Sequence, residues 1–161
     1  VSMYLTPEQQ ATLKTAILAD QTLNQIYSDG DLGALAAALN ADKSPAVVVW
    51  RPSVSKDEIM QNGFDWVEVD NLTVGKARIW EWLFDNNTTT INPSKANVRA
   101  GIGECWKGTA AKLAVQAAVL AHCKRNASVL ESLFVTGAGT TASPALLGVE
   151  GDVSWYDLTS I

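Results

Sequence analysis

Hydrophobic residues near the start of the chain recur every three to four positions, which is the spacing of one face of an α-helix. Residues 6–9 (TPEQ) supply a start for this helix: a capping threonine, a proline at the first helical position and a capping-box glutamine. Leu13, Ile17 and Leu18 then form one apolar face. The pattern predicts an amphipathic helix that packs against a core.

The same periodicity continues over most of the chain. Capping residues such as Asp31, Ser55 and Thr109 precede apolar faces of helical spacing. Further helices are predicted over residues 31–39, 55–62, 71–84, 92–107 and 109–134. A polar loop is predicted over 85–90 (DNNTTT). The expected fold class is therefore mainly α, built as a helical bundle.

One internal segment, residues 44–52, departs from the helical pattern. Three consecutive valines, 47–49, are preceded by Ser-Pro-Ala and followed by Trp-Arg-Pro. β-Branched residues favour strands, and a proline disfavours helix at the residue before it. This segment is expected to be extended, either as a strand or as a clip along the helices.

The end of the chain has a different period. In residues 146–158 (LLGVEGDVSWYDL), Leu147, Val149, Val153 and Trp155 alternate with polar residues or glycine, as in a half-buried strand. Residues 135–145 (VTGAGTTASPA) come before it and have the composition of a flexible connector. The expected organisation is a helical body over 1–134 and an extended C-terminal arm over 135–161 that contains one β-strand.

A lone strand leaves amide and carbonyl groups unpaired, so the arm needs a partner. Within the chain, residues 46–50 are the candidate; the alternative is another chain, joined by β-augmentation. The flexible connector favours the second possibility. A helical body that donates an arm to its neighbour suits a ring of identical subunits, because each contact in a ring is heterologous.

Composition and charge describe a globular domain with few chemical options. Hydrophobic residues make up 47% of the 161 residues, and the formal net charge is −5. The absence of a basic run argues against a nucleic-acid-binding surface. No apolar run reaches the roughly 18 residues that a membrane span needs, and the start of the sequence lacks the pattern of a secretory signal.

The residues that usually carry catalysis are sparse. His122 is the single histidine; it neighbours Cys123 on a predicted helix, where adjacent side chains diverge. Cys105 and Cys123 are expected to be buried thiols in a reducing compartment. No catalytic, cofactor-binding or metal-binding site is expected. An enzyme class stays open only through carboxylates that no spacing singles out: Glu104, Glu131, Asp65 and Glu68.

Aromatic residues are the most distinctive feature. The chain has six tryptophans, and Trp80 and Trp82 lie about 200° apart around a helix. One can therefore enter a core while the other reaches a second surface, and this pattern fits either a wide buried helix or a subunit interface. The residues expected at an interface are Leu147, Val149, Val153, Trp155, Tyr156 and Trp82.

Three stretches resemble uncharacterised proteins encoded among the structural genes of tailed double-stranded DNA phages and prophages. They are SPAVVVWRPSVSKDEIMQNGFDWVEVDNLTVGKARIWEWLFDN (44–86), INPSKANVRAGIGECWKGTAA (91–111) and TASPALLGVEGDVSWYDL (141–158). The resemblance covers nearly the whole chain and carries no catalytic residues. It implies a virion or virion-assembly component.

Head–tail adaptors of such phages are similar in size and outline: a helical body with an extended C-terminal arm, in a dodecameric ring beneath the portal. The resemblance therefore implies a non-enzymatic adaptor (connector or neck) subunit in the virion. Its partners would be itself, the portal and tail proteins, and passively the packaged DNA, with no membrane. The extended segment 46–50 does not match an adaptor pattern. It leaves open another neck or tail protein, a capsid-associated protein, or an assembly chaperone.

Overall fold

A computed structural model describes residues 3–84 and 89–161, so most of the expected polar loop over 85–90 lies outside the described residues. About 52% of the chain is helical. The described ranges contain nine α-helices, one short 3-10 helix and six strands of two or three residues. The expectation of a mainly α protein is confirmed.

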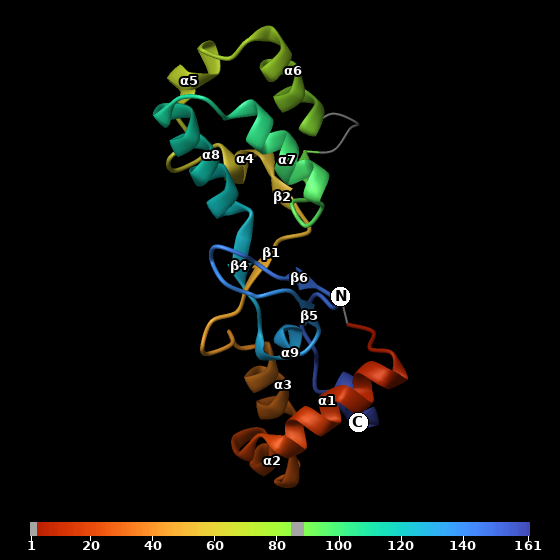
Figure 1. Ribbon diagram of the computed structural model, residues 1–161. Coiled ribbons are helices and arrows are strands. Elements are labelled where there is room, and N and C mark those ends of the chain that lie inside the picture. The colour runs from red at the N-terminus through yellow and green to blue at the C-terminus, as the bar shows by residue number, and fades with distance from the viewer. Residues whose placement is uncertain (1–2, 85–88) are drawn as a thin grey trace. The chain divides into compact units, whose positions relative to one another are not determined.

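The chain divides into two compact units (Figure 1). Unit 1 consists of Val1–Val49 and Asn126–Ile161, and unit 2 consists of Trp50–Arg125. The chain passes from one unit to the other within β1 (Val48–Trp50) and within β4 (Lys124–Asn126). The division does not coincide with the expected boundary between residues 134 and 135, because residues 135–161 belong to unit 1.

Unit 1 is built from short helices that share one apolar core. α1 (Pro7–Ala19), α2 (Gln21–Ser28) and α3 (Leu32–Asn40) come from the first part of the chain. α9 (Val129–Ser132) and the 3-10 helix η1 (Asp157–Ser160) come from the last part. Both parts contribute to the core, which contains Leu5, Leu13, Ile17, Leu23, Leu35, Ala36, Leu39, Leu130, Val153 and Leu158.

Side-chain caps start the helices of unit 1, and those at Thr6 and Asp31 act as expected. Thr6 and Gln9 form a reciprocal capping box at the start of α1. Asp31 accepts a hydrogen bond from the amide of Ala34 and caps α3. Asp20 caps α2 and separates it from α1 by a single non-helical residue. Each cap satisfies amides that the first turn of a helix leaves unpaired.

The C-terminal segment folds back onto unit 1 of its own chain. β5 (Val135–Thr136) and β6 (Leu146–Leu147) pair antiparallel. The expected internal partner also takes part, because Val49 forms a parallel bridge with Ala145. The expected strand over 147–155 is wrong beyond Leu147. The Gly148 amide donates to the carbonyl of Phe134, which lies in the turn before β5. The amides of Gly151 and Val153 donate to side chains, those of Glu131 and Asn40, so the alternation does not mark a ladder.

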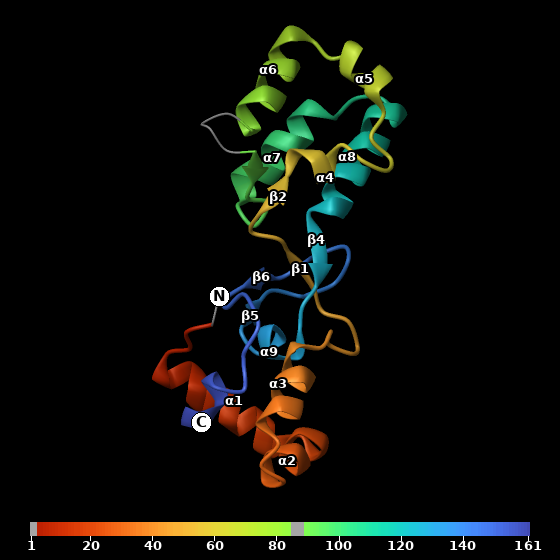
Figure 2. The same cartoon turned by 180° about the vertical axis from the view of Figure 1, so that it is seen from behind.

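Unit 2 surrounds a core rich in aromatic side chains. Phe64, Trp80 and Trp106 contact one another with ring centroids 5.3–6.0 Å apart. Two adjacent helices, α6 (Val74–Leu83) and α7 (Ala96–Cys105), lie side by side in both views (Figures 1 and 2). The remaining elements are β2 (Val54–Ser55), α4 (Lys56–Ile59), α5 (Trp66–Asp70), β3 (Thr90–Ile91) and α8 (Ala110–His122).

The expected helix over 109–134 is wrong in its second half. α8 ends at His122, residues 124–126 form β4, and α9 begins only at Val129. The break is explained by a capping box that starts a new helix: Ser128 and Glu131 exchange hydrogen bonds between side chain and backbone. Among the described residues, no helix is both long and apolar enough to cross a membrane.

Candidate interaction surfaces

Three aromatic side chains of unit 1 are exposed near one another. Tyr4, just before α1, is 87% exposed, and Trp155 and Tyr156, just before η1, are 59% and 70% exposed. The Trp155 and Tyr156 rings meet edge to face with centroids 5.8 Å apart. Tyr4 and Tyr156 line the same shallow hollow, of about 260 Å³. We call Tyr4, Trp155 and Tyr156 the aromatic surface of unit 1.

The backbone beneath this surface is held by hydrogen bonds. Asn40, the last residue of α3, donates to the Val153 carbonyl (2.8 Å) and accepts from the Val153 amide (3.0 Å). Ser154, the next residue, donates from both its amide and its hydroxyl to the Asp157 carboxylate. Val153 and Leu158 are buried on either side of the two aromatic residues. The aromatic side chains therefore project from a fixed turn.

Unit 1 carries a strongly negative net charge. It contains two of the twelve Lys and Arg residues and nine of the seventeen Asp and Glu residues, which gives a formal charge of −7. Asp152 is exposed three residues before Trp155, and Glu8 is exposed in the first turn of α1. Exposed aromatic rings together with carboxylates are the chemistry that attracts a cationic group.

Unit 2 presents a different surface along α6. Val74, Arg78 and Trp82 are spaced by four residues, so they share one side of this helix. Val74 is 76% exposed and Trp82 is 64% exposed, and Arg78 is exposed between them. Trp80, by contrast, is buried against Phe84 and Trp106. We call Val74, Arg78 and Trp82 the α6 stripe.

The expected interface residues lie in three kinds of place. Trp82, Trp155 and Tyr156 are exposed on the two surfaces just defined. Leu147 and Val149 are half-buried and pack against apolar clusters of unit 1. Val153 is almost fully buried in the unit 1 core, so its side chain is not on the surface of this fold.

Sequence reasoning did not find Tyr4 or Arg78. Tyr4 precedes the first capped helix and therefore has no periodic neighbours that would show on which side it lies. Arg78 could have been found from its spacing, because it lies four residues before Trp82 on a predicted helix.

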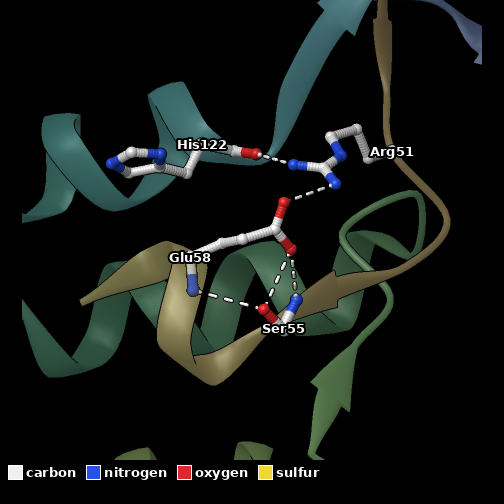
Figure 3. A network of polar contacts seen from close by, with 4 residues as sticks. All are labelled: Arg51, Ser55, Glu58 and His122. Carbon is white, nitrogen blue, oxygen red and sulfur yellow. Dashed lines mark hydrogen bonds and ion pairs between the residues drawn. The ribbon is translucent and has the colours of Figure 1, made fainter. Parts of the chain in front are cut away.

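A polar network in unit 2 joins the start of α4 to the end of α8 (Figure 3). Arg51 donates to a carboxylate oxygen of Glu58 (2.9 Å) and to the carbonyl of His122 (3.1 Å). The other Glu58 oxygen accepts from the amide and hydroxyl of Ser55. The Ser55 hydrogen bonds and the Arg51 guanidinium lower the pKa of Glu58 to about 2. Glu58 is thus a fixed anion that holds the network together.

The side chains that the sequence offered for catalysis lie apart from one another or are engaged in hydrogen bonds and ion pairs within the fold. The His122 ring points away from Arg51 and Glu58 in Figure 3, and its Nε2 lies 3.3 Å from the Asn62 carbonyl. Glu104 pairs with Lys107 on the surface, and this partner lowers its pKa. A general acid needs the opposite shift. Glu131 accepts hydrogen bonds from the amides of Ser128 and Gly151 inside unit 1.

The remaining acidic candidates are Asp65, which caps α5, and Glu68, which lies within it. Asp65 accepts from the amide of Val67, and Glu68 accepts from the side chain of Asn71. Over residues 3–84 and 89–161, no group of three or more His, Cys, Asp or Glu side chains could hold a metal ion. These two carboxylates therefore accept hydrogen bonds from the α5 backbone and from the side-chain amide that follows the helix.

Both cysteines are free and fully buried in the unit 2 core. Burial raises the pKa of Cys105 to about 11 and that of Cys123 to about 12. A thiol with such a pKa stays protonated at neutral pH, whereas a nucleophile or a metal ligand must be a thiolate. The two thiols therefore act as small apolar core residues.

Comparisons of the chain with protein-family models, with curated proteins and with solved structures found no match.

Proposed function

We propose that this chain is a non-enzymatic structural subunit of a tailed-phage virion, and specifically a head–tail adaptor that assembles into a ring. The observation that carries the proposal is the exposure of large aromatic side chains on both units: Tyr4, Trp155 and Tyr156 on unit 1, and Trp66 and Trp82 on unit 2. The resemblance to proteins of phage structural modules supports the same role.

Exposed tryptophan and tyrosine are typical of surfaces that become buried in an assembly. Each of these side chains removes a large apolar area from water when it is covered, and tryptophan, tyrosine and arginine dominate binding energy at interfaces. Their presence on both units suits a subunit that contacts neighbours on two sides, as every member of a ring does. The partners that we propose are copies of itself, the portal and a tail protein.

The proposed ring contact does not require a donated strand. A C-terminal arm that left unit 1 would break both hydrogen bonds between Asn40 and Val153 and would expose the buried Val153 and Leu158 side chains. Contact through the exposed aromatic side chains leaves this part of the fold intact. We therefore propose that neighbours meet through side chains of a folded unit 1.

The acidic balance of unit 1 suits a protein that DNA passes without being held. Carboxylates facing a channel do not bind the phosphate backbone, whereas clustered Lys and Arg would. In the proposed ring, any contact with packaged DNA is therefore passive.

The direct test is mass spectrometry of purified phage or induced-prophage particles that encode this chain, with portal peptides as the reference for copy number. An adaptor is expected at a copy number close to that of the portal. Its absence from finished particles would overturn the adaptor role and would favour an assembly chaperone. A copy number close to that of the major capsid protein would also overturn it and would favour a capsid-associated protein.

A second measurement addresses the position in the particle. Purified chain is mixed with purified portal, and the mass of the complex is measured by light scattering after gel filtration. An adaptor is expected to co-elute with the portal. If the chain never binds the portal but is present in particles, a position elsewhere in the tail replaces the adaptor role.

A further inference from the structure

We propose that the aromatic surface of unit 1 in one copy binds the α6 stripe of unit 2 in a second copy, which makes a head-to-tail contact between identical chains. This inference rests on the proposed role as an assembling subunit and names the surfaces that meet. It uses residues that lie outside both cores, so the contact needs no unfolding of either unit.

The first argument is charge complementarity between the units. Residues 50–125 hold ten of the twelve Lys and Arg residues and eight of the seventeen Asp and Glu residues, so unit 2 has a formal charge of +2 against −7 for unit 1. Opposite net charges favour the approach of unit 1 on one copy to unit 2 on another. The approach of two copies of unit 1 is disfavoured by the same charges.

The second argument is the chemistry of the two surfaces. The α6 stripe places the Arg78 guanidinium between the apolar side chains of Val74 and Trp82. A guanidinium binds well to the face of a tyrosine or tryptophan ring and to a carboxylate. The aromatic surface of unit 1 offers the rings of Trp155 and Tyr156, with Asp152 exposed nearby. An apolar and cationic stripe therefore meets an apolar and acidic surface.

The third argument concerns symmetry. Two unlike surfaces on one chain produce a heterologous contact, and repeated heterologous contacts give a closed ring or an open filament. Contact of each surface with its own copy would bring two Arg78 side chains, or two Asp152 side chains, into the same interface, where their like charges repel. A nucleic acid is a poor alternative occupant, because unit 1 repels phosphates and the stripe supplies only one cation.

The test uses the full chain with Trp82→Ala, which damages the stripe, and Tyr156→Ala, which damages the aromatic surface. Sedimentation velocity gives the distribution of oligomers, and far-UV circular dichroism checks that each variant is folded. Each variant alone is expected to lose at least about tenfold in association constant. An equimolar mixture is expected to form a one-to-one dimer that grows no further, because one intact stripe and one intact aromatic surface remain.

A charge exchange tests the same contact without removing apolar area. Arg78→Glu and Asp152→Arg are each expected to weaken association, and the double variant is expected to recover part of it. Lys95→Glu and Asp29→Arg change the net charge of the same units by the same amount but leave both surfaces intact. As matched controls they are expected to weaken association clearly less than Arg78→Glu and Asp152→Arg.

Three outcomes would overturn the inference: a native chain that stays monomeric at all concentrations, folded variants that associate like the native chain, or a mixture of the two alanine variants that remains monomeric. None of them bears on whether the chain is present in particles, so failure of this contact is distinguishable from failure of the adaptor role. If the chain associates in this way but is absent from particles, the contact between copies stands and the adaptor role fails.

Discussion

At the scale of single residues, Glu58 shows how one side chain can hold several segments. Its carboxylate binds Arg51, which reaches the end of α8, and it closes the capping box with Ser55 at the start of α4. Its side chain is still 43% exposed, so water screens part of the attraction. The role of Glu58 is therefore structural, and it is measurable by titration.

Replacing Glu58 by glutamine is expected to lower the free energy of unfolding by about 1–2 kcal/mol at pH 7, after allowance for solvent screening. The pKa of Glu58 is lowered from 4.5 to about 2, so its stabilisation is complete above about pH 4.5 and is lost as the pH falls toward 2. Urea titrations of the native chain and E58Q between pH 7 and pH 2.5 measure the difference.

The matched control for that experiment is Asp57→Asn, at the exposed neighbouring carboxylate of α4. It is expected to change stability by less than about 0.5 kcal/mol. A stability difference for E58Q that is constant over the whole pH range would contradict an ionised Glu58 as the origin of the effect.

Two glycines test the local packing in opposite directions. A Cβ at Gly148 would overlap the carbonyl oxygen of Phe134, whereas a Cβ at Gly75 in α6 would meet nothing within 4 Å. Gly148→Ala is expected to lower the free energy of unfolding by about 1–3 kcal/mol, because the backbone must move. Gly75→Ala is expected to raise the free energy of unfolding by about 0.5–1 kcal/mol, because it reduces the entropy of the unfolded chain. Thermal denaturation of both variants measures the two signs; equal effects would contradict this packing at Gly148.

At the scale of elements, the segment after β6 is held by side chains from other parts of unit 1. Asn40 binds both polar backbone groups of Val153, and Glu131 accepts from the amide of Gly151. The segment therefore has a fixed course without belonging to a helix or a sheet. Its order depends on a small number of polar side chains, which makes it sensitive to single substitutions.

Asn40→Ala is expected to destabilise the chain by about 1–3 kcal/mol, because it leaves the amide and carbonyl of Val153 without their partner. Hydrogen exchange should increase in residues 150–161 and stay unchanged in residues 50–125. Asn97→Ala, at an exposed position of α7, is the matched control and should leave both regions unchanged. Exchange that increases equally in both units would contradict a local clamp.

Sequence patterns predicted elements well where the signal was local. The capping boxes at residues 6–9 and 55–58 start helices as expected, and the valine-rich segment forms β1. The alternation after Leu147 failed because the partners of that backbone, Asn40 and Glu131, are distant in sequence. The helix break before α9 also had a local signal, the capping box of Ser128 and Glu131. It was missed because apolar residues of helical spacing continue on both sides of the break.

The candidate surfaces were predictable only in part for the same reason. Trp82 could be placed on a surface opposite Trp80, because both lie on one helix. The proximity of Tyr4 to Tyr156 could not be predicted, because it depends on how the two ends of unit 1 fold together. Local periodicity shows which side chains leave a core, whereas the tertiary fold shows which of them gather.

At the scale of the whole molecule, unit 2 is one continuous stretch with its own core. All members of its apolar cluster, including Cys105 and Cys123, lie between residues 50 and 125. A continuous unit of this kind can fold without the rest of the chain when its core is large enough. The cysteines provide a direct probe, because they are protected only when this core is formed.

A chain limited to residues 50–125 is therefore expected to unfold cooperatively on heating, and both thiols should react slowly with Ellman's reagent until denaturant is added. Circular dichroism and absorbance at the reagent's product band measure these two properties. The full chain under the same conditions is the reference. Two thiols that react at once in the short chain, but slowly in the full chain, would contradict an independently stable unit 2.

Unit 1 differs because its two stretches are separated in sequence by the whole of unit 2. During synthesis, α1, α2 and α3 leave the ribosome long before Leu130, Val153 and Leu158, which complete their shared core. Tyr4 and Tyr156 can come together only after residues 153–160 have emerged. A prematurely terminated chain would lack this surface, so the order of translation itself would keep unfinished subunits out of an assembly.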